Sequence, residues 1–304
     1  MADAELRVIT GPTAAGKSGL ALELARRHGA VIVSADSRQI YRRFDIGTAK
    51  PTPAERDAVP HFGIDVVDPG ERWSAAHWAE DAERWVDEAR ATGREVVIVG
   101  GTGFYLRALF SPLFDEPALD PVRRLELQRE LAARSTTDLR RWCETLDPAR
   151  AHLGRARLLR AIEVALLTGA RLSELHARPT RAPRFHARYL VVDPGPTLGE
   201  RIARRVDGMF AAGWADEVRD LMLTIPDDAP AWNAAGYEAV RDEVRGVVTH
   251  AAARERVIIE TRQYAKRQRT WLRHQLDAAR VTRLDPAAAG AIDEAERWWN
   301  GATG

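Results

Sequence analysis

Residues 11–18 read Gly-Pro-Thr-Ala-Ala-Gly-Lys-Ser, directly after a short apolar segment at residues 6–10 and before a helical pattern at residues 18–27. The segment matches the complete G-x-x-x-x-G-K-[ST] pattern of a phosphate-binding loop, or P-loop. In such a loop the backbone N–H groups, the helix N-terminus and the lysine bind anionic oxygens, and the serine hydroxyl ligates Mg²⁺. The pattern predicts a phosphate site made of Gly11, Pro12, Thr13, Ala14, Ala15, Gly16, Lys17 and Ser18, with Ser18 as the Mg²⁺ ligand.

The P-loop does not name the reaction, because ATPases, kinases and other users of diphosphates share it. Nucleotide binding, including ATP, is therefore compatible with the motif.

Continuous apolar segments alternate with helical patterns along the chain, which is typical of a parallel sheet covered on both faces. We predict an α/β fold, a P-loop NTPase-like parallel sheet flanked by helices. The expected strands are residues 6–10, 30–34, 95–99 and 189–192, and the expected helices are residues 18–27, 74–91, 158–167 and 252–275.

Residues 116–184 contain no clear strand and read as a mostly helical insertion. We therefore expect one catalytic core made of residues 1–115 and 185–304, with residues 116–184 as a separate domain. Residues 120–184 carry 14 Lys/Arg against 8 Asp/Glu, although the whole chain has a net charge of only +1. This excess suits a polyanionic partner, and a solvated helical surface is the alternative.

The composition of 304 residues with 45% hydrophobic residues supports a sizeable buried core. The only cysteine is Cys143, so no intrachain disulfide is possible, which fits a reducing compartment. No apolar run approaches the length of a membrane span, and the N-terminus does not resemble a signal peptide. We expect a cytoplasmic protein without membrane contact, and we take a monomer as the default because no signal for oligomerisation is present.

Two polar segments follow expected strands and therefore lie at the carboxyl edge of the sheet, where parallel sheets bind their ligands. Asp36 follows the strand at residues 30–34, and it can hold a metal through water, accept a proton or cap a helix. Thr102 lies in Gly100-Gly-Thr-Gly103, where the glycines permit close approach to a ligand or form a plain turn.

Two further segments are undecided on local sequence. The polar segment at residues 45–51, which contains Lys50, lines the site or is simply exposed. The last long helix carries seven Lys/Arg over residues 254–273, interleaved with Tyr264 and Trp271. For these two aromatic side chains a place in the core is favoured over base stacking.

The segments together resemble the bacterial tRNA dimethylallyltransferases, also called tRNA isopentenyltransferases. They keep one order and span most of the chain. The matching segments are GPTAAGKS (11–18), SADSRQIY (34–41), DIGTAKP (45–51), GGTGFYLRAL (100–109), LDP (146–148), RLLRAIEV (157–164), GYE (236–238) and TRQYAKRQRTWLR (261–273).

The resemblance implies transfer of a dimethylallyl group from dimethylallyl diphosphate to N6 of the adenosine 3′-adjacent to the anticodon of a tRNA. It implies Asp36 as the general base and Thr102 as a contact to the acceptor base or the diphosphate. Lys17 stabilises the leaving diphosphate, and Arg201 and Arg205 are further candidates for contacting it. The residues implied as tRNA contacts are Asp36, Ser37, Arg38, Gln39, Thr102, Arg123, Arg157, Arg160, Lys266, Arg267, Gln268 and Arg273.

The chain departs from the family pattern at three places. It has Pro60-His61-Phe62 in place of His-His-Leu, Leu153-Gly154 in place of Asn-Asp, and Ala235 before the GYE segment. The change at residues 153–154 falls in the expected tRNA-contacting domain, so it affects expectations about tRNA engagement more than those about chemistry.

Three other functions share part of the pattern. An adenylate isopentenyltransferase has the same P-loop and aspartate, but its small acceptor does not need a basic insertion. A small-molecule kinase accounts for the P-loop alone. A non-catalytic RNA-binding protein leaves the set of Lys17, Ser18 and Asp36 unexplained.

Overall fold

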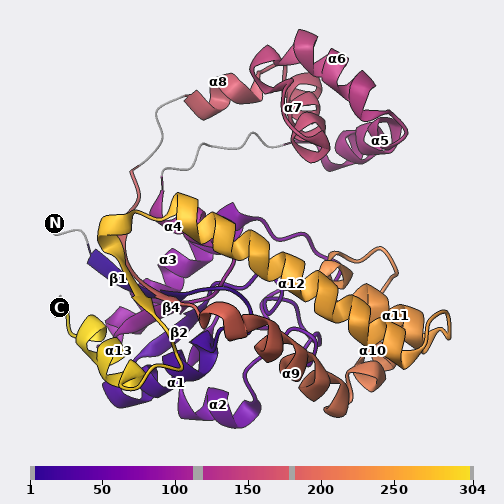
Figure 1. Cartoon of the computed structure of the whole chain (residues 1–304). Coiled ribbons are helices and arrows are strands. Elements are labelled where there is room, and N and C mark those ends of the chain that lie inside the picture. Colours follow the sequence, from indigo (N-terminus) through magenta and orange to yellow (C-terminus); the bar gives the residue numbers. More distant parts are fainter. Residues whose placement is uncertain (1–3, 112–118, 178–181, 302–304) are drawn as a thin grey trace. The chain divides into compact units, whose positions relative to one another are not determined.

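The computed structural model describes residues 4–111, 119–177 and 182–301 (Figure 1). The chain forms two compact units, which we call the core unit (residues 1–110 and 183–304) and the insertion unit (residues 111–182). The boundaries expected from the sequence, after residues 115 and 184, lie close to this division. Each unit has a buried apolar cluster of its own.

The core unit is built on one sheet in which all six strands pair in parallel. The order is β3-β2-β4-β1-β5-β6, with bounds Ala4–Thr10 (β1), Val31–Ser34 (β2), His61–Phe62 (β3), Val96–Val99 (β4), Phe185–Val192 (β5) and Val281–Leu284 (β6). The four expected strands are confirmed, and they form the middle of the sheet. The two strands at the edges, β3 and β6, have no counterpart among the expected strands.

Helices cover both faces of the sheet, and their bounds are Lys17–His28 (α1), Ala75–Ala91 (α3), Gly103–Phe110 (α4) and Ala291–Trp299 (α13). On one face Leu24 of α1 and Trp299 of α13 pack with Ile9 in a single apolar cluster. On the other face Trp78 of α3 stacks on Tyr105 of α4, with ring centroids 4.6 Å apart. Because strand side chains alternate between the faces, the apolar strands supply buried side chains to both faces of the sheet.

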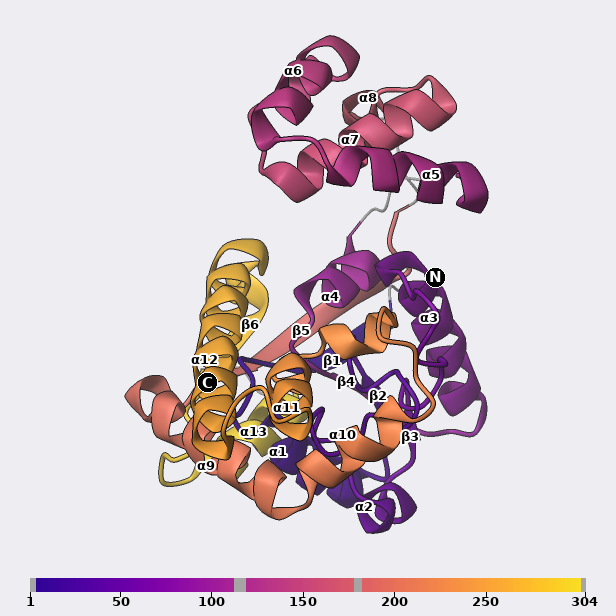
Figure 2. The same cartoon turned by 90° about the vertical axis from the view of Figure 1, so that its right-hand side faces the viewer.

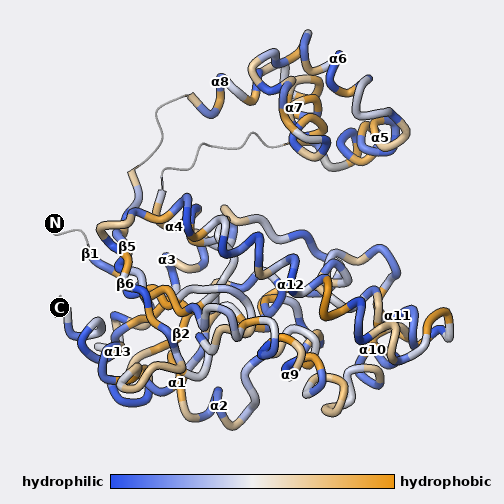
Figure 3. The backbone as a smooth tube through the Cα atoms, in the orientation of Figure 1, coloured by the Kyte–Doolittle hydropathy of each residue, from blue (hydrophilic) through white to orange (hydrophobic). Residues whose placement is uncertain are grey.

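The four α-helices between β5 and β6 group together (Figure 2): α9 (Leu198–Ala211), α10 (Trp214–Met222), α11 (Tyr237–Val244) and α12 (His250–Gln275). In Figure 3 the long helix α12 is coloured mostly as hydrophilic, although Val257, Ala265 and Leu272 are buried along one side of it. The short helix α2 (Pro53–Ala58) begins at a complete capping box formed by Thr52 and Glu55. No helix among the described residues has both the length and the apolar character required to cross a membrane.

The insertion unit is helical throughout its described residues, with α5 (Pro121–Ala132), α6 (Thr136–Leu146), α7 (Arg155–Thr168) and α8 (Leu172–Ala177). Its buried cluster includes Leu139 and Cys143 from α6 and Leu158 and Ile162 from α7. The fully buried Asp147 accepts hydrogen bonds from both the N–H and the hydroxyl of Ser173, which fixes the start of α8. Cys143 is buried within this unit as a free thiol.

Candidate active site

Two cavities of about 410 Å³ and about 220 Å³ lie at the carboxyl edge of the sheet. The smaller cavity contains Lys17 and Ser18 of the P-loop, and the larger one contains Arg38 and Arg267. The two cavities share lining residues, so they adjoin each other. The residues shared by both walls are Thr13, Asp36, Arg205 and Tyr264.

The P-loop connects β1 to α1, and distant residues hold its backbone. Arg201 Nε donates to the carbonyl oxygen of Ala14 at 3.0 Å. Arg205 Nη1 lies 3.5 Å from the hydroxyl oxygen of Thr13, and Lys17 Nζ donates to the carbonyl oxygen of Pro12 at 2.7 Å. Arg201 therefore supports the P-loop from its carbonyl side. It also lines a further cavity of about 460 Å³ beside the loop, together with Lys17, Ser18 and Arg205.

The cationic groups at this site are crowded and poorly hydrated. Desolvation and the nearby charge of Arg205 lower the pKa of Lys17 to about 8, and the charge of Asp36 opposes this shift. Desolvation also lowers the pKa of Arg205. Positive charges held close together in a partly buried site attract an anion, because the anion relieves their repulsion.

Asp36 occupies a turn that follows β2, not the N-cap of a helix. Its Oδ1 accepts hydrogen bonds from the N–H groups of Arg38 at 2.8 Å and Gln39 at 3.4 Å. Both contacts use Oδ1, so the turn is fixed by one carboxylate oxygen while the side chain lines both cavities. Thr102 joins this turn, since its Oγ1 accepts the N–H of Ser37 at 3.0 Å.

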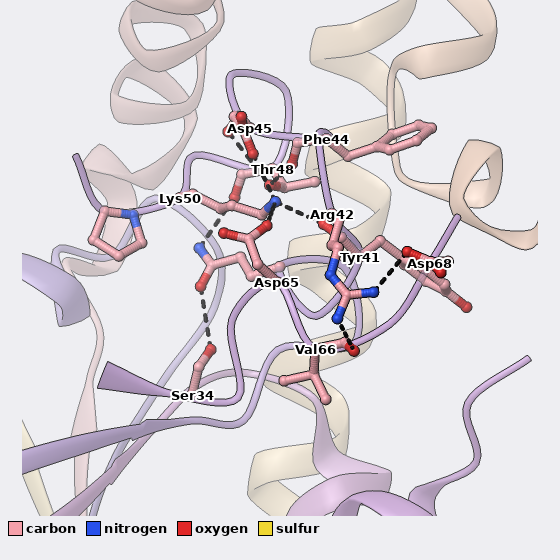
Figure 4. A network of polar contacts seen from close by, with 12 residues as sticks. Ser34, Tyr41, Arg42, Phe44, Asp45, Thr48, Lys50, Asp65, Val66 and Asp68 are labelled. Atoms are coloured by element: carbon pink, nitrogen blue, oxygen red, sulfur yellow. Dashed lines mark hydrogen bonds and ion pairs between the residues drawn. The ribbon is translucent and has the colours of Figure 1, made fainter. Parts of the chain in front are cut away.

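Lys50 is buried and paired, with only 2% of its side chain exposed. Its Nζ lies 2.6 Å from a carboxylate oxygen of Asp45 and 2.5 Å from one of Asp65, and it donates to the carbonyl oxygen of Tyr41 (Figure 4). The adjacent Gln39 donates from Nε2 to the carbonyl oxygens of Thr48 and Ala49. These contacts attach the segment 45–51 to the turn that carries Asp36. The segment also lines the two cavities, so the alternative that it is simply exposed is wrong.

Gln268 of α12 connects the two glycine-rich segments. Its Oε1 accepts the N–H of Thr13 at 2.7 Å, and its Nε2 donates to the carbonyl oxygen of Gly101 at 2.9 Å. A Cβ atom at Gly101 would lie 2.3 Å from this Nε2, and one at Gly103 would lie 2.3 Å from the ring of Trp271. These two glycines thus make room for α12. The close approach that these glycines permit is therefore an approach of the side chains of Gln268 and Trp271 to the turn.

The other residues predicted to contact tRNA lie in both units. In the core unit Lys266, Arg267 and Arg273 are exposed on α12, whereas the buried Gln268 is better suited to bracing the loops. In the insertion unit Arg123 and Arg157 are exposed. Arg160 is half-buried and pairs with the buried Glu163 at 3.0 Å, which fixes the direction of its guanidinium group.

The residues present fit a Mg²⁺ ion that is held jointly with a bound diphosphate. No group of three or more His, Cys, Asp or Glu side chains in the described part of the chain is arranged to hold a metal without other ligands. Ser18 and Asp36 nevertheless line the same cavity as Lys17. Mg²⁺ is commonly bound through one or two protein oxygens together with substrate phosphates and water.

The sequence model of the IPP transferases matches residues 39–275, which is well over half of the chain. This chain belongs to the IPP transferase family. A relative from Halorhodospira halophila named tRNA dimethylallyltransferase is 43% identical over 91% of this chain and 92% of its own length. Another of the same name from Anaeromyxobacter sp. is 44% identical over 89% of this chain and 92% of its own length.

Solved structures agree with this membership. The full-length tRNA isopentenylpyrophosphate transferase of Bacillus halodurans aligns with a TM-score of 0.70 and 32% identity, covering 98% of this chain and 96% of that chain. A eukaryotic dimethylallyltransferase that acts on tRNA aligns with a TM-score of 0.81 and 24% identity, covering 99% of this chain and 80% of that chain, which supports the fold. The chain is accordingly a prenyltransferase with a P-loop-like parallel sheet.

Sequence reasoning missed part of the wall of this IPP transferase site. It favoured a core position for Tyr264, which instead lines both cavities. Helical spacing held a usable signal, because Tyr264, Gln268 and Trp271 are four and three residues apart and therefore share one face of α12. His61 of β3 also lines the smaller cavity, where burial lowers the pKa of its imidazole.

Proposed function

We propose that this IPP transferase moves a dimethylallyl group from dimethylallyl diphosphate to N6 of the adenosine 3′-adjacent to the anticodon of a tRNA, releasing diphosphate. The observation that carries the proposal is the pair of adjoining cavities with Asp36 in both walls. A donor site and an acceptor site that meet at a carboxylate are what transfer to a weakly nucleophilic amine requires.

The smaller cavity is suited to the donor. Lys17 and Ser18 are the diphosphate ligands at one side of it, and Leu22, Ile32 and Val99 supply apolar contacts for the dimethylallyl group. The leaving diphosphate gains charge as the bond between its oxygen and C1 breaks. The desolvated cations Lys17 and Arg205 stabilise that charge where it develops.

The larger cavity is suited to the adenosine, which must leave its stack to reach a site at this depth. Tyr264 offers an aromatic face, and Arg38 and Arg267 offer charge to the neighbouring phosphates. N6 forms its bond to C1 while Asp36 accepts the proton that N6 loses. Thr102 fixes the turn of Asp36 through Ser37.

Mg²⁺ is part of the proposal, with Ser18 as its protein ligand and Asp36 close enough to hold it through water. When bound, the ion neutralises charge on the diphosphate. We further propose that the basic insertion unit contacts the anticodon stem-loop through Arg123, Arg157 and Arg160, and that the enzyme works as a cytoplasmic monomer.

The test supplies the protein with Mg²⁺, labelled dimethylallyl diphosphate, and either undermodified tRNA or AMP. We expect label in tRNA, and nuclease digestion followed by mass spectrometry should place it on one adenosine beside the anticodon. Labelling of AMP in preference to tRNA would indicate an adenylate isopentenyltransferase instead. Formation of ADP from ATP, with no transfer from dimethylallyl diphosphate, would indicate a kinase.

A further inference from the structure

Residues 45–51, which we call the 45–51 loop, form part of the walls of both cavities. Gly47 and Thr48 line the larger cavity, and Ala49, Lys50 and Pro51 line the smaller one. Gln39 binds the carbonyl oxygens of Thr48 and Ala49, so a shift of the loop also displaces the turn of Asp36. The position of this loop therefore affects donor site, acceptor site and general base together.

The 45–51 loop does not hold this shape by backbone preference alone. Ala49 has a φ of 50°, in the left-handed region that non-glycine residues seldom adopt. The internal hydrogen bonds from Ala49 N–H to Ile46 and from Lys50 N–H to Asp45 close the turn, but both stay within the loop. A strained conformation of this kind persists when surrounding groups fix it.

The group that fixes the start of the loop is the carboxylate of Glu217, which comes from α10. Its Oε2 accepts the N–H of Asp45 at 3.0 Å and the N–H of Ile46 at 2.6 Å. Its Oε1 lies 3.5 Å from the N–H of Gly47. Three successive N–H groups thus converge on one carboxylate, an arrangement that favours an anion over a neutral group.

Glu217 is itself held in place by the GYE segment. The hydroxyl of Tyr237 donates to Oε1 of Glu217 at 2.7 Å. Tyr237 is buried, and both burial and the charge of Glu217 raise the pKa of its hydroxyl, which therefore remains a donor. Trp214, one turn before Glu217, packs so closely on Gly47 that a Cβ atom there would lie 2.3 Å from its ring.

The other end of the loop is held by the buried Lys50 and its carboxylate partners (Figure 4). Asp45 belongs to both attachments, because its N–H binds Glu217 and its side chain binds Lys50. The loop is thus fixed between two charged groups, one from α10 and one of its own. Glu217 lies outside the loop, whereas Lys50 is part of it.

We propose that Glu217 is a positioning residue for prenyl transfer, whose negative charge holds the 45–51 loop against both substrate cavities. The inference rests on the proposed function only for its effect on rate. The contact itself links two sequence segments, DIGTAKP and GYE, to which the proposed chemistry assigns no reacting group.

The first test reads the loop directly and needs no substrate. The chain has only three lysines, Lys17, Lys50 and Lys266, and Lys50 is buried while Lys266 is exposed on α12. Limited acetylation with an amine-reactive ester followed by mass spectrometry therefore measures Lys50 against an internal reference. In Glu217→Gln, which keeps the shape of the side chain and removes its charge, labelling of Lys50 relative to Lys266 should rise several-fold.

The matched control is Asp216→Asn, which removes the carboxylate of the preceding residue. Asp216 is exposed and pairs with Arg219 on the same helix. This control should leave the labelling of Lys50 at the level of the unmodified protein. Equal protection of Lys50 in Glu217→Gln and Asp216→Asn would overturn the proposal.

The second test measures prenyl transfer to tRNA at a temperature well below unfolding. In Glu217→Gln, kcat/KM should fall about tenfold to a hundredfold for both substrates, since a small displacement of reacting groups costs this much. A purely structural Glu217 would lower the midpoint of thermal unfolding and leave kcat and KM of the folded enzyme unchanged. That pattern also rejects the proposal.

Tyr237→Phe provides a milder variant in case Glu217→Gln does not fold. It removes one hydrogen bond to Glu217 and leaves the contacts with the loop N–H groups in place. Labelling of Lys50 should rise less, and kcat/KM should fall a few-fold. No change in either would contradict the proposal. Should the unmodified protein fail to transfer the prenyl group, the proposed function is lost, whereas the labelling result still decides the role of Glu217.

Discussion

The carboxylate of Asp36 fixes a turn and is also the proposed general base. One oxygen caps the turn after β2, through the N–H groups of Arg38 and Gln39. The side chain also lies where the two cavities meet, as a general base must. An alanine at this position would remove both tasks at once. Asparagine separates them, because its amide oxygen still caps the turn but cannot accept the proton.

Asp36→Asn should therefore lower kcat for transfer to tRNA by about a hundredfold or more while the midpoint of thermal unfolding stays nearly unchanged. Rates at saturating substrates and a melting curve provide the comparison. A variant that retains full activity would remove Asp36 as the base.

Lys17 links diphosphate binding to pH. Its pKa of about 8 lies below the ordinary value of 10.5, so the side chain is mostly charged below pH 8 and mostly neutral above it. A bound anion favours the charged form, which means that binding above pH 8 requires uptake of a proton. The affinity for diphosphate must therefore fall as pH rises through 8.

Calorimetric titration with inorganic diphosphate between pH 7 and pH 9.5 tests this dependence. The unmodified protein should lose close to tenfold in affinity for each pH unit above 8, beyond the change due to the titration of diphosphate itself. Lys17→Arg keeps its charge over this pH range, so its profile gives the change in affinity that is due to the titration of diphosphate alone. Identical pH profiles of the two proteins would refute the assignment.

At the residue scale, the sequence predicted that Lys17, Ser18 and Asp36 lie at one edge of the sheet, and they line the same cavity. The reason is that a P-loop and residues that follow parallel strands have fixed positions relative to the sheet edge. The sequence could not predict which side chains hold them. Gln268 acts through partners 255 and 167 residues away in the sequence. The partners of Lys50 lie within 15 residues, but no local pattern distinguishes a buried lysine with two carboxylate partners from an exposed one. The interpretation of Gln268 as a tRNA contact came from the family resemblance of the segment at residues 261–273.

At the scale of elements, α12 is the part that joins the P-loop to the turn containing Thr102. The two atoms of the Gln268 amide have opposite hydrogen-bonding character, and each has the partner it requires. A carboxylate at this position could accept from Thr13 but could not donate to Gly101. Gln268→Glu would leave a carbonyl oxygen facing a buried negative charge.

Gln268→Glu should destabilise the core unit by about 1–3 kcal/mol and lower kcat/KM for dimethylallyl diphosphate. Urea unfolding and steady-state kinetics measure the two effects. Gln275→Glu, an exposed change at the end of the same helix, should have little effect on either. Comparable losses in both variants would mean that charge on α12, not the bridge, is responsible.

The strands that the sequence missed are short and have little apolar content. The strand β3 has two residues, and β6 reads Val-Thr-Arg-Leu, with a single buried side chain. Both are edge strands, and tertiary pairing decides whether such short segments become strands. The expected helices were found because their apolar spacing extends over several turns, with the true ends up to three residues beyond the expected ones.

At the scale of the whole molecule, charge is distributed unevenly between the units. Residues 120–184 hold 14 basic against 8 acidic side chains in a chain of net charge +1. In the insertion unit Arg123 and Arg157 are exposed. Contacts between such side chains and phosphates release counterions, so tRNA affinity must depend steeply on salt.

The double variant Arg123→Ala/Arg157→Ala should bind tRNA about tenfold or more weakly at low salt, with the slope of log affinity against log salt reduced by about 1.5. Affinity for dimethylallyl diphosphate should not change, since its site lies in the core unit. Filter binding over a salt series measures the first effect, and calorimetry measures the second. An unchanged salt slope would exclude these two residues as phosphate contacts.

The division of the chain was foreseeable, because apolar strands are missing between residues 116 and 184 while they recur on either side. Residues 153–154, where the chain departs from the family pattern, lie at the start of α7. Gly154 is the N-cap of this helix and provides no side-chain cap.

The strand order β4-β1-β5 has a consequence for how the protein is made. During translation β1 can pair with β4 once residue 99 has left the ribosome, but its other edge must wait for β5, whose register joins Ala4 to Phe185 and Thr10 to Val191. At ordinary elongation rates the insertion unit takes roughly 4–14 s to synthesise. For that interval the nascent sheet carries an unpaired apolar edge, which is a template for pairing with other chains. The P-loop directly follows β1. The edge of the sheet beside this early motif is therefore paired only after β5, in the second half of the chain, has been synthesised.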